Sequence, residues 1–207
     1  MSIQLYSKFK TKWLQVLTAY RVRDKKSSVE MGNLDNIPDV HAWDYVSRKK
    51  DPIVDISRPD AVVIVPIVKT LEGNKICVTE EFRIPINDYE WGFPAGLIEP
   101  NETLIDSIKR ELKEETGLQV VRFIDSSLPI YSSAGLTDES VIMAFVECEG
   151  EITNANQEET EDIKPHLLDI GQVKDLLSLN GVVKMGAKAW GILSHFARIG
   201  EIEWKSL

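Results

Sequence analysis

Two stretches near the start of the chain alternate apolar and polar positions as strands do. They are residues 12–23, KWLQVLTAYRVR, and residues 40–50, VHAWDYVSRKK. Residues 24–39 between them are rich in Lys, Ser, Asn, Gly and Asp, which are the residues of turns and loops. The pattern predicts an N-terminal antiparallel β ribbon. Because a lone ribbon is only marginally stable in water, it should pack on the main domain or on a second subunit.

The main domain is predicted to begin near residue 59. Residues 60–69, DAVVIVPIVK, form a continuous β-branched run typical of a buried strand, and residues 75–83 follow a turn and complete a hairpin. The remaining pattern predicts strands at 89–93, 119–126, 129–132, 139–148 and 161–170, and helices at 171–179 and 183–199. Strands and helices follow no regular βαβ order, so we expect an α+β fold with residues 1–58 as the ribbon and 59–207 as the main domain.

A further helix is predicted between Thr103 and Gly117. Thr103 and Asp106 have the spacing of a capping box, and Gly117 suits a left-handed helix end. A projection at about 100° per residue puts four apolar residues within one arc: Leu104, Ile105, Ile108 and Leu112.

Two carboxylates of this helix lie beside its apolar face. Glu115 projects inside the apolar arc and Glu111 next to it, whereas the lysines of the helix point away. Carboxylates in this position are costly to desolvate unless a cation or hydrogen bonds satisfy them. Hard oxygen ligands suit Mg²⁺ or Mn²⁺, so the helix is a candidate metal platform. The alternative is an exposed Glu/Lys helix between two turns.

Charge and composition narrow the class of ligand. The net charge is −9, and a binder of nucleic acid or of anionic membranes would instead show a basic face. No apolar run is long enough to span a bilayer, so we expect a cytoplasmic protein. Cys77 and Cys148 lie in apolar, strand-like runs and are expected to be reduced core residues. A phosphate ligand would need local basic residues or divalent cations.

The stretch from Gly96 to Leu118, GLIEPNETLIDSIKRELKEETGL, resembles the signature of the Nudix hydrolases, G-x5-E-x7-R-E-U-x-E-E-x-G-U with U apolar. The resemblance implies the Nudix α/β/α sandwich, a mixed sheet flanked by helices. It also implies hydrolysis of a nucleoside diphosphate linked to another group, with Mg²⁺ or Mn²⁺ as the cofactor.

The same resemblance implies roles for individual residues. Glu111 and Glu115 would be metal ligands, with Glu114 as a further ligand or helper. Arg110 would orient these carboxylates, and the backbone carbonyl of Ala95 would be another ligand.

Motifs outside this stretch resemble the ADP-ribose pyrophosphatase branch. They are residues 81–83 (EFR), 93–98 (FPAGLI), 133–139 (SAGLTDE) and 159–163 (ETEDI). In the last motif the first choice for general base is Glu159, with Glu161 as an added metal ligand, and the two roles could be exchanged. The alternative for this motif is an acidic solvent loop.

The N-terminal ribbon also resembles that branch, in which two tryptophans sandwich adenine across a homodimer. Trp13 and Trp43 are the candidates, because a flat indole stacks on a base. The alternative is that they pack within the ribbon or an interface. The other residues expected to contact the substrate are Asp44 (at the adenine amino group), Arg48 and Arg83 (at phosphate or base), Gly96 and Gly135.

Two departures leave the substrate open. Ala134 stands where the branch usually has proline, and Gly92 where it commonly has glutamate. The expected substrate is ADP-ribose or a related nucleoside diphosphate sugar, with a GDP-sugar or a dinucleotide as alternatives. A non-catalytic ADP-ribose-sensing domain is a further alternative, which the complete set of signature glutamates disfavours.

Overall fold

The computed structural model describes residues 2–22, 40–52, 58–157, 161–179 and 182–202 of the 207-residue chain. Its contacts divide the chain into two compact units, residues 1–60 with 129–141 and residues 61–128 with 142–207. The sequence contained no signal that residues 129–141 would join the N-terminal unit. Among the described residues, no helix is long and apolar enough to cross a membrane.

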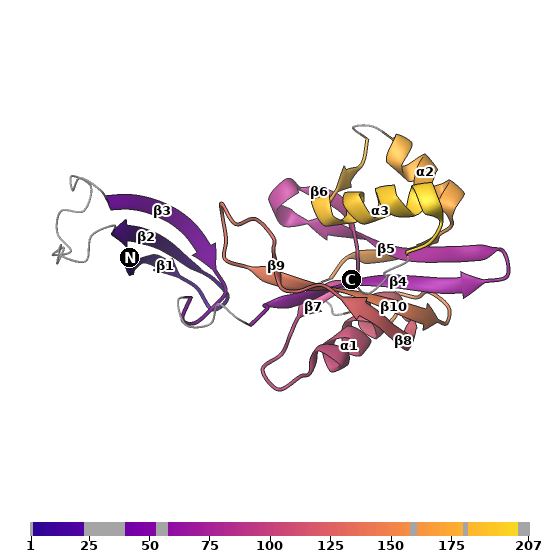
Figure 1. The fold of residues 1–207 in the computed structure, drawn as a ribbon, viewed down its shortest axis with the longest axis horizontal. Helices are drawn as coiled ribbons and strands as arrows, with labels where there is room; N and C mark the ends of the chain where they lie inside the picture. The colour runs from indigo at the N-terminus through magenta and orange to yellow at the C-terminus, as the bar shows by residue number, and fades with distance from the viewer. Residues whose placement is uncertain (1, 23–39, 53–57, 158–160, 180–181, 203–207) are drawn as a thin grey trace. The chain divides into compact units, whose positions relative to one another are not determined.

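The N-terminal unit holds a three-stranded antiparallel sheet in the order β1-β2-β3 (Figure 1). Its strands are β1 (Ser2–Lys10), β2 (Gln15–Val22) and β3 (Val40–Ser47). The predicted antiparallel ribbon is confirmed as β2 and β3, while β1 was missed. The register of β1 shifts between Ser7 and Phe9, and this irregularity breaks the alternation by which strands are recognised.

A distant segment completes this unit. β9 (Ile130–Tyr131) pairs with the first two residues of β10 (Ser140–Glu149), and the segment between them lies along β3. There the amide of Val46 donates to the carbonyl of Leu136 at 2.9 Å, and Val46 forms a parallel bridge with Thr137.

The second unit is built on a mixed sheet with the strand order β12-β6-β5-β4-β10-β8. β11 also pairs with β5, and β7 with β4. Most neighbours are antiparallel, but β12 runs parallel to β6. The strand bounds are β4 (Ala61–Thr70), β5 (Gly73–Arg83), β6 (Asp88–Gly92), β7 (Ala95–Leu97), β8 (Gln119–Ser126), β11 (Ile163–Leu168) and β12 (Lys184–Met185).

Helices cover both faces of this sheet, with α1 on one side and α2 and α3 on the other (Figure 1). Their bounds are α1 (Leu104–Thr116), α2 (Ile170–Ser178) and α3 (Ala187–Ile199), and a 3₁₀ turn spans Ile84–Ile86. The α+β sandwich with a mixed sheet is therefore confirmed. The helix predicted at 183–199 began too early, because Lys184 and Met185 pair with β6.

The core beneath α1 fixes the position of this helix. Ile108 and Leu112 are almost completely buried against β-strand residues that include Val62 and Ile64. Burying a side chain of this size stabilises the fold by about 1.5–3 kcal/mol. Cys77 and Cys148 lie in the same cluster as free thiols, so α1 packs on a hydrophobic core.

Candidate metal site on helix α1

Local sequence determines where α1 begins and ends. The amide of Asp106 donates to the Thr103 hydroxyl at 3.2 Å, and the Thr103 amide donates back to the Asp106 carboxylate at 3.3 Å. At the other end Gly117 has φ +76° and donates to the Lys113 carbonyl. A Cβ there would lie 2.4 Å from a side-chain carbon of Thr153, so glycine is required for space as well as for backbone angle.

Two glutamates of α1 are buried, as the projection predicted. Glu111 is 7% exposed and Glu115 is 4% exposed. The amide of Ala95 in β7 donates to Oε2 of Glu115 at 3.2 Å. Burial raises the pKa of both carboxyl groups, and raises that of Glu115 well above its ordinary value with further contributions from Glu111, Glu81 and Glu161. Both charges therefore lie where a cation would be favourable.

Gly96 leaves the space that the carboxyl group of Glu111 occupies. A Cβ built on Gly96 would lie 1.8 Å from Oε1 and 2.0 Å from Cδ of Glu111. The backbone of β7 thus approaches α1 closely only because residue 96 has no side chain.

Arg110 holds the carboxylates around it with its whole guanidinium group. Its Nε and Nη2 donate to the two oxygens of Glu102 at 2.7 and 2.9 Å, and Nη2 also donates to the carbonyl of Leu97 at 3.1 Å. Its Nη1 donates to Glu111 at 2.7 Å and to Glu114 at 3.1 Å. The guanidinium, assisted by Ser107, lowers the pKa of Glu102 to about 2. Arg110 therefore links α1 to the loop before it and orients Glu111.

We expect Gly96→Ala to separate activity from stability. The clashing atoms end a flexible side chain, so Glu111 would move aside and the free energy of unfolding would change by less than about 1 kcal/mol. A displaced ligand should lower kcat/KM by about 100-fold. The control is Gly92→Ala, whose Cβ would meet only Oγ1 of Thr79, at 3.9 Å. Activity of Gly96→Ala equal to that of the control would contradict the assignment of Glu111.

The donor set fits a small hard divalent cation. In the described part of the chain, which excludes residues 158–160, no group of three or more acidic, His or Cys side chains is arranged so that it could hold a metal ion. Mg²⁺ does not require such a group, because it keeps several waters and is usually bound by one or two carboxylates together with substrate phosphates. Glu111 and Glu115 supply two buried carboxylates on adjacent turns of one helix.

The other residues predicted for this site differ in how close the structure brings them to Glu111 and Glu115. Glu161 lies near enough to raise the pKa of both buried glutamates, whereas Glu159 lies outside the described residues. Glu114 is bound by Arg110 at the rim of the site.

Glu81 also lies near this site, because its charge contributes to the raised pKa of Glu115, whereas the sequence indicates it only as part of the motif at residues 81–83. The pKa of its carboxyl group is raised by burial first and then by Glu161 and Glu90, while Arg83 lowers it across a 2.6 Å ion pair. Strand alternation in β5 puts Glu81 on the same face as Cys77, and this is the signal that could have identified it. Arg83 also approaches Glu90 at 3.5 Å.

Most residues predicted to bind the base lie in the N-terminal unit, whereas Arg83, predicted at phosphate or base, lies on β5 in the second unit. Trp13 and Trp43 are 63% and 60% exposed, as stacking surfaces for a ligand would be. Asp44 faces away from Trp43 and is held by Lys8 at 2.8 Å and by the Thr18 hydroxyl at 2.6 Å, and the Lys8 contact is the main cause of its lowered pKa. The other two predicted residues of this unit also have partners within it. Arg48 pairs with Glu139 at 2.6 Å, and the Gly135 carbonyl accepts a hydrogen bond from the Trp43 indole.

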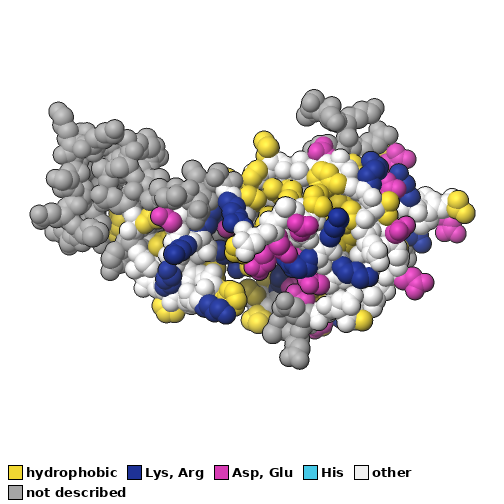
Figure 2. Space-filling model, turned by 90° about the horizontal axis from the view of Figure 1, so that it is seen from below, with side chains coloured by type: hydrophobic (Ala, Val, Ile, Leu, Met, Phe, Trp, Pro, Cys, Tyr) yellow, Lys and Arg dark blue, Asp and Glu magenta, His cyan; other side chains and the backbone are white. Residues whose placement is uncertain are grey.

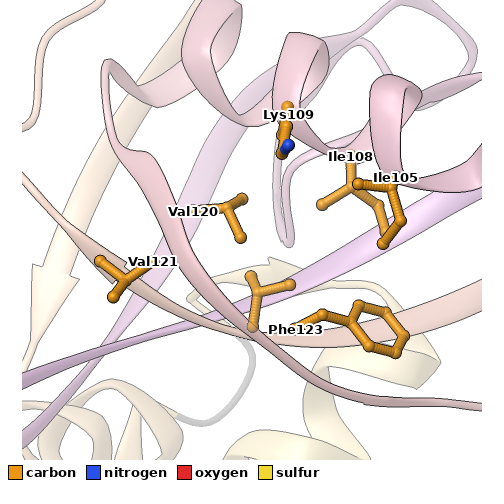
Figure 3. Close-up of a pocket in the computed structure, with 7 residues that line it drawn as sticks. Ile105, Ile108, Lys109, Val120, Val121 and Phe123 are labelled. Carbon is orange, nitrogen blue, oxygen red and sulfur yellow. The ribbon is translucent and has the colours of Figure 1, made fainter.

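An apolar hollow of about 260 Å³ lies between α1 and β8 (Figure 3). Its lining is aliphatic or aromatic except for Lys109: Ile105, Ile108, Lys109, Val120, Val121, Phe123 and Val146. No carboxylate lines it, so it is not part of the candidate metal site. On the face shown in Figure 2, acidic side chains lie interspersed with basic ones.

The fold and the α1 site together define a class of enzyme. The NUDIX domain family model matches residues 58–184, and the chain belongs to the Nudix family of hydrolases. Hydrolases of this family generally use divalent metals such as Mg²⁺.

Individual relatives agree with this assignment. The chain is 30% identical over 169 residues to a Caenorhabditis elegans protein named as a nudix hydrolase, covering 77% of this chain and 75% of that protein. It is 41% identical over 58 residues to the Escherichia coli ADP compounds hydrolase NudE, covering 28% of this chain and 29% of the enzyme. A crystal structure of an ADP compounds hydrolase has the same fold, with a TM-score of 0.61, 15% identity and coverage of 97% and 96% of the two chains.

Proposed function

We propose that this protein hydrolyses the diphosphate bond of ADP-ribose, or of a closely related nucleoside diphosphate sugar, in a Mg²⁺-dependent reaction. The products would be a nucleoside monophosphate and a sugar phosphate. The observation that carries the proposal is the pair of buried glutamates of α1, one held by the Ala95 amide and the other by Arg110 under Gly96. The motifs at residues 81–83, 93–98 and 133–139 support the substrate class.

Several residues around α1 would bind the metal or position its ligands. Glu111, Glu115 and the Ala95 carbonyl would hold the metal, with Glu161 as an added ligand, and Arg110 would keep Glu111 in place. When bound, Mg²⁺ would supply positive charge to offset the diphosphate.

A carboxylate of the motif at residues 159–163 would act as the general base. Glu159 would accept a proton from water while the water oxygen bonds to one phosphorus and the bridging oxygen leaves with the other phosphate. The roles of Glu159 and Glu161 could be exchanged, as the sequence motif allows.

The register of the ribbon favours a homodimer for base binding. Trp43 is paired with Ala19 of β2, whereas Trp13 lies six residues before Ala19. The four residue steps from Gln15 to Ala19 span about 13 Å at about 3.3 Å per residue, and Trp13 lies beyond Gln15 in the turn before β2, so its backbone is far from that of Trp43 compared with the thickness of one base. Two indoles that sandwich one adenine would therefore come from two copies of the chain.

We expect Trp13→Ala and Trp43→Ala each to raise KM for ADP-ribose by about tenfold, because stacking of one base on an aromatic side chain contributes about 1–3 kcal/mol. The effect on kcat should be much smaller, since the indoles do not touch the diphosphate in this proposal. Trp190→Ala is the matched control, because Trp190 is also 60% exposed but lies in α3. KM values unchanged from the wild type would remove the adenine-sandwich idea.

The proposed function is tested by a substrate panel in a phosphate-release assay coupled to a phosphatase. ADP-ribose, other nucleoside diphosphate sugars, dinucleoside polyphosphates and NADH would each be compared with Mg²⁺ and with Mn²⁺. We expect the highest kcat/KM for ADP-ribose or a related ADP-sugar. Preference for a GDP-sugar would move the substrate to the alternative class, and cleavage of none of them would contradict the hydrolase proposal.

A further inference from the structure

Trp43 combines high exposure with a fixed ring. Its indole Nε1 donates to the carbonyl of Gly135 at 3.0 Å, joining β3 to a segment 92 residues further along the chain. In the described part of the chain, the indole nitrogen of Trp13 shows no such bond, and its ring has a cation–π contact with the flexible ammonium of the neighbouring Lys12 at 4.3 Å. The two equally exposed tryptophans therefore differ in how their rings are held.

The bond from Trp43 belongs to a series of contacts between β3 and residues 133–139. The amide of Val46 donates to the Leu136 carbonyl at 2.9 Å. The Ser47 hydroxyl donates to Asp138 at 2.9 Å, and Nε of Arg48 donates to Glu139 at 2.6 Å. We call this series, from Trp43–Gly135 to Arg48–Glu139, the β3 seam.

The seam is anchored at its buried end. The ammonium of Lys49, a residue only 8% exposed, donates to Asp60 at 2.6 Å and to the Asp138 carbonyl at 3.3 Å. Asp60 also accepts from the amide of Ser140 at 2.9 Å. Buried, paired charges hold one geometry because each would be costly to leave unpaired. The 133–139 segment is therefore held firmly at its buried end, near Asp138, and contacts the exposed Trp43 at Gly135.

We propose that residues 133–139 position Trp43, and that the Gly135 carbonyl holds the indole plane ready for a nucleobase before the ligand arrives. The proposal rests on the proposed function in one respect, namely that Trp43 stacks on the base. Holding the ring in advance removes the entropy cost of ordering it on binding. The 133–139 segment would thus influence base affinity by holding a ring on another strand.

Replacement by phenylalanine isolates the role of the indole N–H. Trp43→Phe keeps an aromatic ring but loses the bond to Gly135, while Trp13→Phe measures the loss due to the poorer stacking of phenylalanine alone. We expect the increase in KM for ADP-ribose in Trp43→Phe to exceed that in Trp13→Phe by about threefold to tenfold. The increase should fall on KM much more than on kcat.

A double-mutant cycle tests the coupling through the seam. Ser47→Ala removes the bond to Asp138 and should raise KM by itself, but should add little to Trp43→Phe because both changes release the same ring. Equal KM values for the two phenylalanine variants, or fully additive effects of Ser47→Ala and Trp43→Phe, would overturn the proposal.

Hydrogen exchange without ligand distinguishes failure of this proposal from failure of the proposed function. Amides of residues 133–139 should exchange several-fold faster in Trp43→Phe than in the wild type, and at the wild-type rate in Trp13→Phe. If ADP-ribose is neither bound nor cleaved but this exchange difference is found, the proposed function fails and the positioning of Trp43 stands. Wild-type exchange rates in Trp43→Phe would contradict the positioning role whatever the substrate.

Discussion

Glu115→Gln is expected to lower kcat/KM for ADP-ribose by about 10²–10⁴-fold, because metal-based charge stabilisation contributes several kcal/mol to such reactions. Glutamine keeps the size of the side chain and an oxygen that can accept from the Ala95 amide, but removes the charge that would bind the metal. Glu72→Gln, in the exposed turn between β4 and β5, is the control. Near-wild-type turnover by Glu115→Gln at saturating Mg²⁺ would show that Glu115 is not a metal ligand.

The same variant should be more stable than the wild type when metal is absent. The pKa of Glu115 is raised in the folded protein, so the folded state binds more protons than the unfolded state between the ordinary pKa of 4.5 and the raised one. Wild-type stability therefore falls as pH rises through this window, and glutamine removes that loss.

The stability difference is measured by denaturant unfolding in a chelator. Glu115→Gln should exceed the wild type in free energy of unfolding at pH 8, and the difference should shrink as pH falls toward 4.5. Added Mg²⁺ should stabilise the wild type and have a much smaller effect on the variant. A variant that is less stable than the wild type at pH 8 would contradict the burial of an uncompensated charge at residue 115.

Arg110→Lys is expected to lower kcat/KM by about 100-fold although the charge is kept. A lysine ammonium cannot reproduce the planar group that contacts Glu102, Glu111, Glu114 and the Leu97 carbonyl together. The lost bonds should also reduce the free energy of unfolding by about 1–3 kcal/mol.

The control for this prediction is Arg122→Lys. Arg122 also bonds a carboxylate, Glu147, through two nitrogens, but it lies on β8 and is 56% exposed. We expect this variant to keep wild-type turnover. If Arg110→Lys also stays within twofold of the wild type in turnover, Arg110 does not set the position of Glu111.

The parts of the structure that sequence could predict are those set by local chemistry. The start of α1 follows from the Thr103–Asp106 capping box and its end from Gly117, each a signal within one turn of the helix end that it sets, and its buried carboxylates follow from helical periodicity. β1 escaped prediction because its register shift interrupts the alternation. β12 escaped because its pairing with β6 is a contact between strands about 90 residues apart, which leaves no periodic pattern in two residues.

The same distinction holds within the site. The signature residues could be assigned to a platform, but the reason for Gly96, the space taken by Glu111, depends on how closely β7 approaches α1. Glu81 lies close to Glu115 because β5 brings it there, and β5 is separated from α1 in the sequence. The bond from Trp43 to Gly135 joins residues 92 positions apart, and no local pattern indicates it.

In the proposed reaction, a divalent cation held by Glu111 and Glu115 supports cleavage of the diphosphate. The most direct measurement is turnover of ADP-ribose by the metal-free protein during a Mg²⁺ titration, with the products separated by chromatography. We expect turnover that rises from the background with Mg²⁺ to a plateau, with AMP and ribose 5-phosphate as the products, and no such rise in Glu111→Gln. Turnover that is independent of added metal and insensitive to a chelator, or equal in Glu111→Gln, would contradict this role of the cation.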